Sequence, residues 1–208
     1  MSRANEHKRT AGPARARTAA PQAPGEVRII GGQWKRTRLP VPDRPGLRPT
    51  PDRVRETLFN WLGQDLSGWR CLDAFAGTGA LGLEAASRGA ANVQLVEQDP
   101  GLAAQLRRHA ERLGASGVQV RRGDGLQALR EAAGTSLDLV LLDPPYGQEA
   151  LFLPALQAAA RALAGAGLVY LEASRAWKDA ELAGTGLMLH RHLKAGAVHA
   201  HLLRAGTA

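Results

Sequence analysis

Apolar residues recur along this chain in two alternating patterns from residue 70 onward. Five short apolar runs are typical of buried parallel strands, whereas the segments between them repeat apolar positions every three or four residues, as helices do. The predicted strands cover residues 70–74, 92–97, 118–122, 137–143 and 167–172, and the predicted helices cover 81–88, 102–113, 126–133 and 151–163. Because the two patterns alternate over short, glycine-bounded intervals, we expect βαβ units that wind a parallel sheet with helices on both faces.

Two further apolar runs, 187–193 and 197–203, predict strands that are joined near Gly196. They would close the sheet with an antiparallel pair and bring it to seven strands. The predicted fold is therefore α/β, with a doubly wound and mostly parallel seven-stranded sheet. This is the Rossmann-like layout of the class I S-adenosylmethionine-dependent methyltransferase fold.

The segment before this sheet has its own pattern. Residues 27–30, the pair Gly31-Gly32 and residues 33–39 predict a two-stranded ribbon with a glycine turn. A proline-rich linker follows, in which Thr50 and Pro51 predict the N-cap and first-turn proline of a helix over 52–62. The predicted organisation is a disordered basic tail over 1–26, a basic ribbon and linker over 27–50, and a methyltransferase domain over 51–205.

Charge is concentrated at the amino-terminal end of the chain. Residues 1–55 carry 13 Lys and Arg against 4 Asp and Glu, so all of the net charge of +8 lies there and the remainder is close to neutral. A basic segment on a near-neutral α/β domain predicts an extended polyanionic partner, most simply RNA held through its phosphates. The candidate RNA-contacting residues are Arg28, Lys35, Arg36, Arg38 and Arg48.

Composition also excludes several classes. The single Cys71 cannot form an intramolecular disulfide or a thiolate zinc site, and the histidines between 190 and 201 follow a strand period with no metal-ligand spacing. No run of eighteen apolar residues and no signal-peptide core occurs, so neither a membrane span nor secretion is predicted. We expect a cytoplasmic monomer that needs no metal.

The strongest candidate chemistry is the sequence Asp143-Pro144-Pro145-Tyr146, which ends the apolar run 137–142. Open α/β sheets bind their ligands at this end of a strand. The Asp143 carboxylate and the Pro144 carbonyl can accept hydrogen bonds from an exocyclic amino group, and the Tyr146 ring can stack on the base that carries it. This set predicts an enzyme that acts on an extruded base.

A second candidate site is the glycine loop that follows the first strand of the sheet. Glycines there let the backbone approach a nucleotide-like cofactor, although Gly77, Gly79 and Gly82 also fit a dinucleotide-binding fingerprint. Three acids at successive strand ends favour S-adenosylmethionine over NAD: Asp73 for the amino group, Glu97 for the ribose hydroxyls and Asp124 for the adenine amino group.

Four segments of the chain resemble the bacterial 16S ribosomal RNA guanine(966)-N2 methyltransferases. They are residues 28–34, 46–62, 73–83 and 143–146, within a resemblance that covers roughly residues 27–205. The glycine loop and the Asp-Pro-Pro-Tyr sequence are shared with many amino-methyltransferases, whereas the block 46–62 is more specific. The long tail, 1–26, is not part of the shared core.

This resemblance implies methylation of a guanine N2 in small-subunit rRNA, on an assembling subunit. It also implies that Asp73, Phe75, Gly77, Gly79, Glu97 and Asp124 hold the cofactor, and that residues 143–146 hold the flipped guanine. The residues alone leave three alternatives open: a DNA adenine-N6 or cytosine-N4 methyltransferase, a noncatalytic RNA-binding assembly factor, and an NAD-dependent dehydrogenase. The first would use the same Asp-Pro-Pro-Tyr sequence, but the chain is too short for a separate target-recognition domain.

Overall fold

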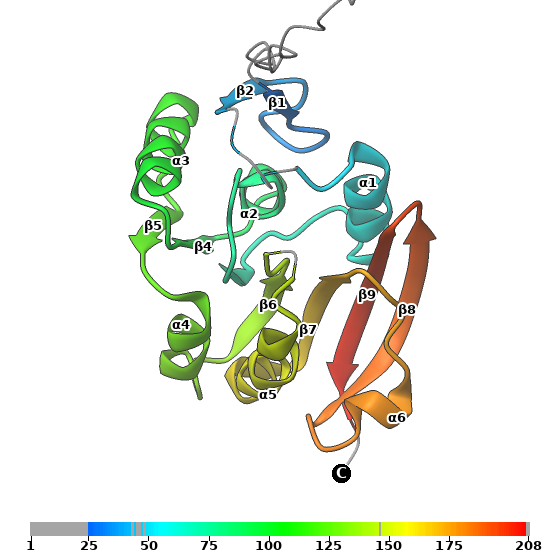
Figure 1. Ribbon diagram of the computed structural model, residues 1–208. Coiled ribbons are helices and arrows are strands. Elements are labelled where there is room, and N and C mark those ends of the chain that lie inside the picture. Colours follow the sequence, from blue (N-terminus) through cyan, green and yellow to red (C-terminus); the bar gives the residue numbers. More distant parts are fainter. Residues whose placement is uncertain (1–24, 43, 45–46, 48, 146, 207–208) are drawn as a thin grey trace, which may run out of the picture.

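The computed structural model describes residues 25–42, 44, 47, 49–145 and 147–206. At its centre lies a seven-stranded sheet in the order β5-β4-β3-β6-β7-β9-β8 (Figure 1). Its strands are β3 (Arg70–Asp73), β4 (Asn92–Glu97), β5 (Val118–Arg122), β6 (Leu137–Leu142), β7 (Leu163–Ala173), β8 (Leu187–Ala195) and β9 (Val198–Ala205). β3 to β7 are mutually parallel, and β9 is antiparallel to both β7 and β8. The predicted fold class is confirmed.

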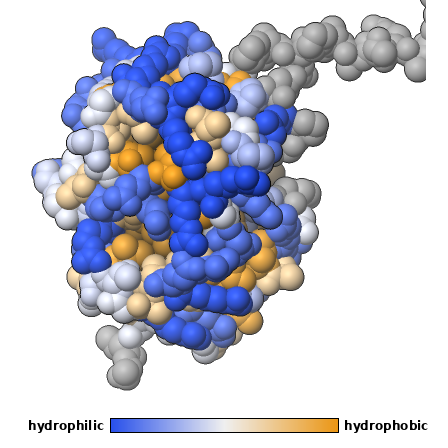
Figure 2. Space-filling model, turned by 90° about the vertical axis from the view of Figure 1, so that its left-hand side faces the viewer, coloured by the Kyte–Doolittle hydropathy of each residue, from blue (hydrophilic) through white to orange (hydrophobic). Residues whose placement is uncertain are grey.

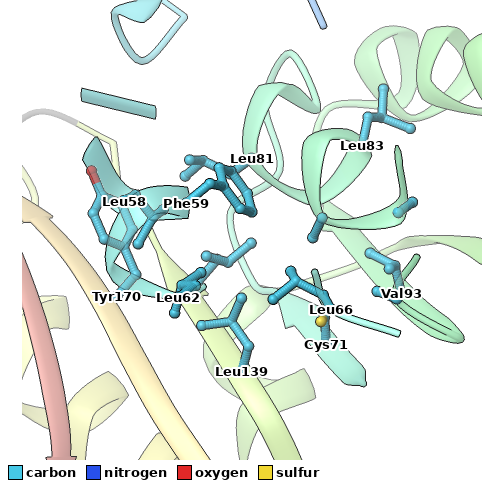
Figure 3. Close-up of a cluster of buried hydrophobic side chains, with 14 of the residues drawn as sticks. Leu58, Phe59, Leu62, Leu66, Cys71, Leu81, Leu83, Val93, Leu139 and Tyr170 are labelled. Carbon is cyan, nitrogen blue, oxygen red and sulfur yellow. The ribbon is translucent and has the colours of Figure 1, made fainter. Parts of the chain in front are cut away.

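Helices cover both faces of the sheet (Figure 1). On one face, α1 (Asp52–Trp61), α2 (Ala80–Ser87) and α3 (Pro100–Leu113) bury Leu58, Leu83 and Leu106 in one apolar cluster. On the other, α4 (Gly125–Glu131), α5 (Phe152–Ala162) and the short α6 (Asp179–Leu182) contribute to a second cluster. Figure 3 shows the first cluster, in which Leu58 lies beside Tyr170.

The helix α3 illustrates how local sequence sets an element's ends. The Asp99 side chain accepts a hydrogen bond from the Leu102 N–H at 2.8 Å, and Pro100 occupies the first turn, where its missing N–H costs nothing. Gly114 ends the helix in the left-handed region at φ 62°. The boundaries predicted from periodicity therefore fall within two residues of the observed ones.

The strand β7 is longer than its apolar run predicted. It begins at Leu163, directly after α5, whereas the sequence predicted a start at residue 167. Leu137 pairs with Leu163 and Leu139 pairs with Leu168, so the register shifts across a bulge that contains Gly165 and Gly167. The bulge takes up the extra residues, and periodicity alone cannot detect such an insertion. A short 3-10 turn, η1 (Glu149–Leu151), also precedes α5.

The predicted amino-terminal ribbon exists, but its predicted strands and turn are wrong. β1 (Gly25–Arg28) pairs antiparallel with β2 (Arg38–Val41), and residues 29–37 form a loop between them. The loop closes on itself near its ends, where the Ile29 N–H donates to the Thr37 carbonyl at 2.9 Å and the Arg36 N–H donates to the Ile29 carbonyl at 2.8 Å. The physical reason that no longer ladder forms is that the middle of the loop docks on α2. Glu84 of α2 accepts hydrogen bonds from the backbone N–H groups of Ile30 and Gly31, at 2.8 and 2.7 Å.

We call residues 25–42 the arm. Because β1 begins at Gly25, the last two residues of the predicted tail belong to this strand; residues 1–24 of that tail lie outside the described residues. Ile29 and Leu39 are fully buried in the cluster that contains α1 and α2. The arm is thus packed into the main fold.

Figure 2 views the molecule from the side of α3 and β5, and hydrophilic side chains cover most of this face. Among the described residues, Leu153 of α5 stands out as an exposed large apolar side chain. None of the described helices combines the length and apolar character that crossing a membrane requires.

Candidate active site

The candidate site lies where the strand order reverses. β3 neighbours β4 on one side and β6 on the other, and open α/β sheets bind ligands at such a switch point, beyond the carboxyl ends of the strands. Asp73 is the last residue of β3, and Asp143 directly follows β6. Asp73 is in register with Leu141, so the two predicted acids stand at neighbouring strand ends.

The glycine loop after β3 requires glycine at specific positions. Gly77 and Gly79 adopt φ values of 49° and 79°, which side chains rarely tolerate. A Cβ at Gly79 would lie 2.5 Å from the Leu106 side chain of α3. Gly79 also directly precedes α2, so the loop leads into the start of a helix.

Asp73 is the most unusual acid of the site, because it is 1% exposed. One carboxylate oxygen accepts a hydrogen bond from the Gly82 N–H at 3.0 Å, while Oδ1 has no hydrogen-bond partner among the described residues. Burial raises the pKa of Asp73 to about 7, although the backbone N–H groups of Gly82 and Phe75 oppose this shift. A buried carboxylate oxygen without a partner calls for a donor from a ligand, and an ammonium group would satisfy it.

Glu97 and Asp124 lie at the ends of β4 and β5, as predicted, but both also stabilise the protein backbone. The two Glu97 oxygens accept hydrogen bonds from the N–H groups of Gly77 and Asp99, at 2.8 and 2.7 Å. Asp124 caps α4 by accepting from the Gln127 N–H at 2.7 Å. These bonds hold the carboxylates in fixed directions at the sheet's edge, and each oxygen keeps a second lone pair for a ligand.

Phe75 lies between the glycine loop and the end of β5. Its ring packs against the cluster that contains α4 and α5, and it lies 2.9 Å from the position that a Cβ of Gly125 would occupy. Phe75 and Asp124 are therefore neighbours across this edge, as a shared role toward one cofactor requires.

The Asp-Pro-Pro turn follows β6. Pro144 is buried, Asp143 is partly buried and Pro145 is exposed, whereas Tyr146 lies outside the described residues. Burial raises the pKa of Asp143 well above its usual value, and the charges of Glu172 and Asp73 act in the same direction. Asp143 is thus surrounded by other acids.

Two residues that lie near Asp143 were not predicted from the sequence to be part of the site. Thr50 was predicted to cap α1, which is wrong: Pro51 holds the cap position, and the Thr50 hydroxyl lies 3.4 Å from Asp143 Oδ2 as a hydrogen-bond donor. Glu172, near the end of β7, accepts a hydrogen bond from the Tyr170 hydroxyl at 3.0 Å. Glu172 could have been found as a further acid at a strand end, since its strand had been predicted.

The predicted RNA-contacting residues occupy the arm and its linker. Arg28 and Arg38 form exposed ion pairs with Asp52 and Glu26, at 2.7 and 3.2 Å. Lys35 and Arg36 are exposed in the loop 29–37. Arg48 lies outside the described residues. The four described side chains lie on one segment, but ion pairing leaves Arg28 and Arg38 partly neutralised.

A buried group of charged residues, which the sequence did not reveal, fixes the arm. Glu84 accepts hydrogen bonds from Arg88 Nε at 2.9 Å and Arg55 Nη1 at 3.4 Å, in addition to those from the arm. Arg55 in turn donates to the carbonyls of Arg28 and Thr50, at 3.0 and 3.2 Å. We call Arg55, Glu84 and Arg88 the ionic hub; it connects the arm's backbone to Thr50 and so to Asp143.

The sheet order, the glycine loop after β3 and the Asp-Pro-Pro turn after β6 together define a protein of the class I methyltransferase fold. The family model of Conserved hypothetical protein 95 matches residues 27–204, and the chain belongs to this family. The family resemblance predicted from the sequence motifs is thereby confirmed.

Curated relatives and solved structures agree with this membership. The chain is 51% identical over 122 residues to "Ribosomal RNA small subunit methyltransferase D" of Escherichia coli; the match covers 59% of this chain and 61% of that relative's length. The structure "Putative methyltransferase yhhF" from Escherichia coli is 37% identical, covers 87% of this chain and 98% of that one, and superposes with a TM-score of 0.74. The putative methylase HI0767 of Haemophilus influenzae is 32% identical, covers 87% and 99%, and gives a TM-score of 0.69.

Proposed function

We propose that this protein is an S-adenosylmethionine-dependent methyltransferase that modifies the exocyclic N2 amine of one guanine in 16S rRNA, on the assembling small ribosomal subunit. One observation carries the proposal: a buried Asp73 oxygen, which has no partner among the described residues, and the Asp143 carboxylate stand at neighbouring strand ends of the switch point. The name of the Escherichia coli relative, a ribosomal RNA small subunit methyltransferase, supports the substrate class.

The residues at the edge formed by β3, β4 and β5 fit this cofactor. Asp73 Oδ1 would accept a hydrogen bond from its amino group, Glu97 would bind the ribose hydroxyls, and Phe75 and Asp124 would hold the adenine. Gly77 and Gly79 leave room for the ligand to approach the backbone. When bound, S-adenosylmethionine supplies a methyl group that is activated by a positively charged sulfur.

The main task of the protein in this reaction is to orient the guanine N2 amine. The lone pair of guanine N2 is delocalised into the ring, so the amine is a weak nucleophile. Asp143 and the Pro144 carbonyl would accept hydrogen bonds from the two N–H groups of the amine. These bonds would favour a geometry in which the N2 lone pair faces the methyl carbon. After transfer, Asp143 or water would take the proton that the methylated N2 amine has to lose. No strong base is required.

Substrate binding is assigned to the arm and to Tyr146. Lys35 and Arg36, together with Arg28, Arg38 and Arg48, would contact phosphates of the RNA. Tyr146 would stack on the extruded guanine, an interaction worth about 1–3 kcal/mol. Because Arg55 joins the arm to Thr50, RNA bound to the arm would lie close to the elements that support Asp143.

The direct test is methyl transfer from isotope-labelled S-adenosylmethionine to purified small subunits that lack the modification, with duplex DNA as a parallel substrate. We expect label in 16S rRNA and none in DNA. Label in DNA alone would support the adenine-N6 or cytosine-N4 alternative. Binding to subunits without any transfer would support a noncatalytic assembly factor.

A further inference from the structure

The second carboxylate of the site, Glu172, stands directly beside Asp143. Leu142 of β6 is in register with Leu171 of β7, so the residues that follow them, Asp143 and Glu172, lie side by side at the sheet's edge. Their side chains continue the face on which Leu141 and Tyr170 pack, because side chains alternate along a strand. This is the face that α1 and α2 cover, and on which Asp73 also lies.

The contacts of Glu172 hold it in place without neutralising it. The Tyr170 hydroxyl donates to Glu172 Oε2 at 3.0 Å, and the Thr50 hydroxyl donates to the neighbouring Asp143 at 3.4 Å. Within the described part of the chain, no Lys or Arg forms an ion pair with either acid. Burial raises the pKa of Glu172.

Two adjacent acids in a partly buried place are unfavourable in the free protein, because like charges at close range oppose ionisation. A fold that only needed a stable strand end would avoid them. Asp73, on the next strand, adds a third carboxylate whose buried Oδ1 has no partner among the described residues. The arrangement therefore calls for a ligand with several hydrogen-bond donors close together, beside the ammonium donor expected at Asp73.

We propose that Glu172 is a specificity-determining residue, whose carboxylate accepts the N1–H of the target guanine while Asp143 accepts from its N2 amine. This inference rests on the function proposed above and deepens it. It assigns a role to a residue outside the Asp-Pro-Pro-Tyr sequence, and it explains why a site of this kind takes guanine.

The argument follows from the donors and acceptors of each base. In guanine, the N2 amine is next to N1–H, so two donors stand side by side. In adenine and cytosine, the amine is next to a ring nitrogen that only accepts. Above its raised pKa, Glu172 is ionised and can only accept hydrogen bonds. Glu172 would therefore repel the ring nitrogen of adenine or cytosine, and the site would discriminate against these bases.

The test uses small subunits reconstituted with 2,6-diaminopurine in place of the target guanine. This base keeps the N2 amine but carries an acceptor at N1. Wild-type protein should methylate it at least about 100-fold more slowly than guanine, because a site built for a donor rejects an analogue that lacks it. In Glu172→Gln, the side-chain amide can donate to that nitrogen. The preference for guanine over 2,6-diaminopurine should then shrink by at least about tenfold.

Glu111→Gln, at an exposed position of α3, is the matched control and should keep the wild-type preference. Binding of S-adenosylmethionine to Glu172→Gln reports whether this variant folds. Equal rates of the wild-type protein on the two bases would overturn the role of Glu172 while leaving the proposed function intact. An unchanged preference in a folded Glu172→Gln would overturn it as well. If wild-type protein transfers no methyl group even to guanine, both proposals fall together.

Discussion

The carboxyl edge of the sheet and the arm differ in what determines their structure. At the carboxyl edge, each site residue is placed by its position at the end of a strand, and that position can be read from the alternation of apolar runs. In the arm, the path of residues 29–37 is determined by Glu84 and Ser87 of α2, more than fifty residues further along the chain. Local pattern thus locates the first region, whereas long-range hydrogen bonds shape the second.

This difference suggests which changes will affect which property. Substitutions at the carboxyl edge should alter chemistry and cofactor binding while leaving the fold intact. Substitutions in the ionic hub should alter stability, because its charged side chains are buried and each depends on the others.

Glu84→Ala should be the most destabilising change. It removes the carboxylate that pairs with buried Arg88, leaves Arg55 paired with Asp52 alone, and removes the acceptor for the Ile30 and Gly31 N–H groups. Breaking a buried ion pair on one side typically costs about 3–5 kcal/mol. Denaturant unfolding, followed by circular dichroism, would measure this loss. The control Glu111→Ala should change the unfolding free energy by no more than about 0.5 kcal/mol. A loss of similar size in both variants would refute the role of the hub.

Asp143→Ala should affect turnover and not stability. Removing a group that orients the reacting amine should lower kcat by about 100- to 1,000-fold, comparable to the loss of a preorganised hydrogen-bonding group. The affinity for S-adenosylmethionine should stay within about twofold, because the cofactor residues lie on other strands. Single-turnover kinetics and calorimetry would separate the two. Glu56→Ala, at an exposed site on α1, is the control; full turnover by Asp143→Ala would remove this residue from the mechanism.

The raised pKa of Asp73 predicts that cofactor affinity depends on pH. With its pKa at about 7, Asp73 is protonated in the free protein below that pH, whereas the cofactor's ammonium group needs the ionised form. Affinity should therefore rise with pH by up to about tenfold per unit below pH 7 and then level off. Asp73→Asn should weaken binding by roughly tenfold at pH 8 and flatten the profile. Calorimetry between pH 5.5 and 8.5 would measure this; a profile equally steep in the variant would assign the proton to another group.

The raised pKa of Asp73 has the opposite effect on the unfolding free energy, which should fall as pH rises. An unfolded Asp73 would release its proton near its ordinary pKa of 3.8, whereas the folded protein holds it up to about pH 7. The folded state thus binds more protons in this window, and the contribution of Asp73 to stability declines as pH rises through it. Asp73→Asn should remove that part of the decline, which unfolding experiments at pH 5 and pH 8 would detect.

The smallest effect is expected from the exposed arm residues. Replacing both Lys35 and Arg36 by Ala should weaken binding to the small subunit by several-fold. It should also lower the slope of log affinity against log salt by about 0.7–0.9 per lost phosphate contact. The unfolding free energy should not change. Arg130→Ala with Arg161→Ala, on the helices of the opposite face, is the control. An equal loss of slope in both double variants would mean that the arm has no special role.

The difference between the carboxyl edge and the arm also explains which features could be predicted from the sequence. Asp73, Glu97, Asp124 and Asp143 could be placed because strand ends of a parallel sheet share one edge. Thr50 was assigned to a helix cap, because a threonine before Pro-Asp fits that local role and nothing local indicates that it faces Asp143. The pairing of β1 with β2 could not be predicted either: Gly31-Gly32 reads as a turn, and only the contact with Glu84 shows that it is a docking point.

The function itself can be tested most directly inside cells. The protein would be expressed in a bacterial host whose own family member has been deleted. Mass spectrometry would then identify the modified nucleosides of the host's 16S rRNA. The account predicts that the wild-type protein restores N2-methylguanosine at one position and that Asp143→Ala, at equal abundance, does not. Restoration of a different methylated nucleoside, or no restoration by a folded wild-type protein, would contradict it.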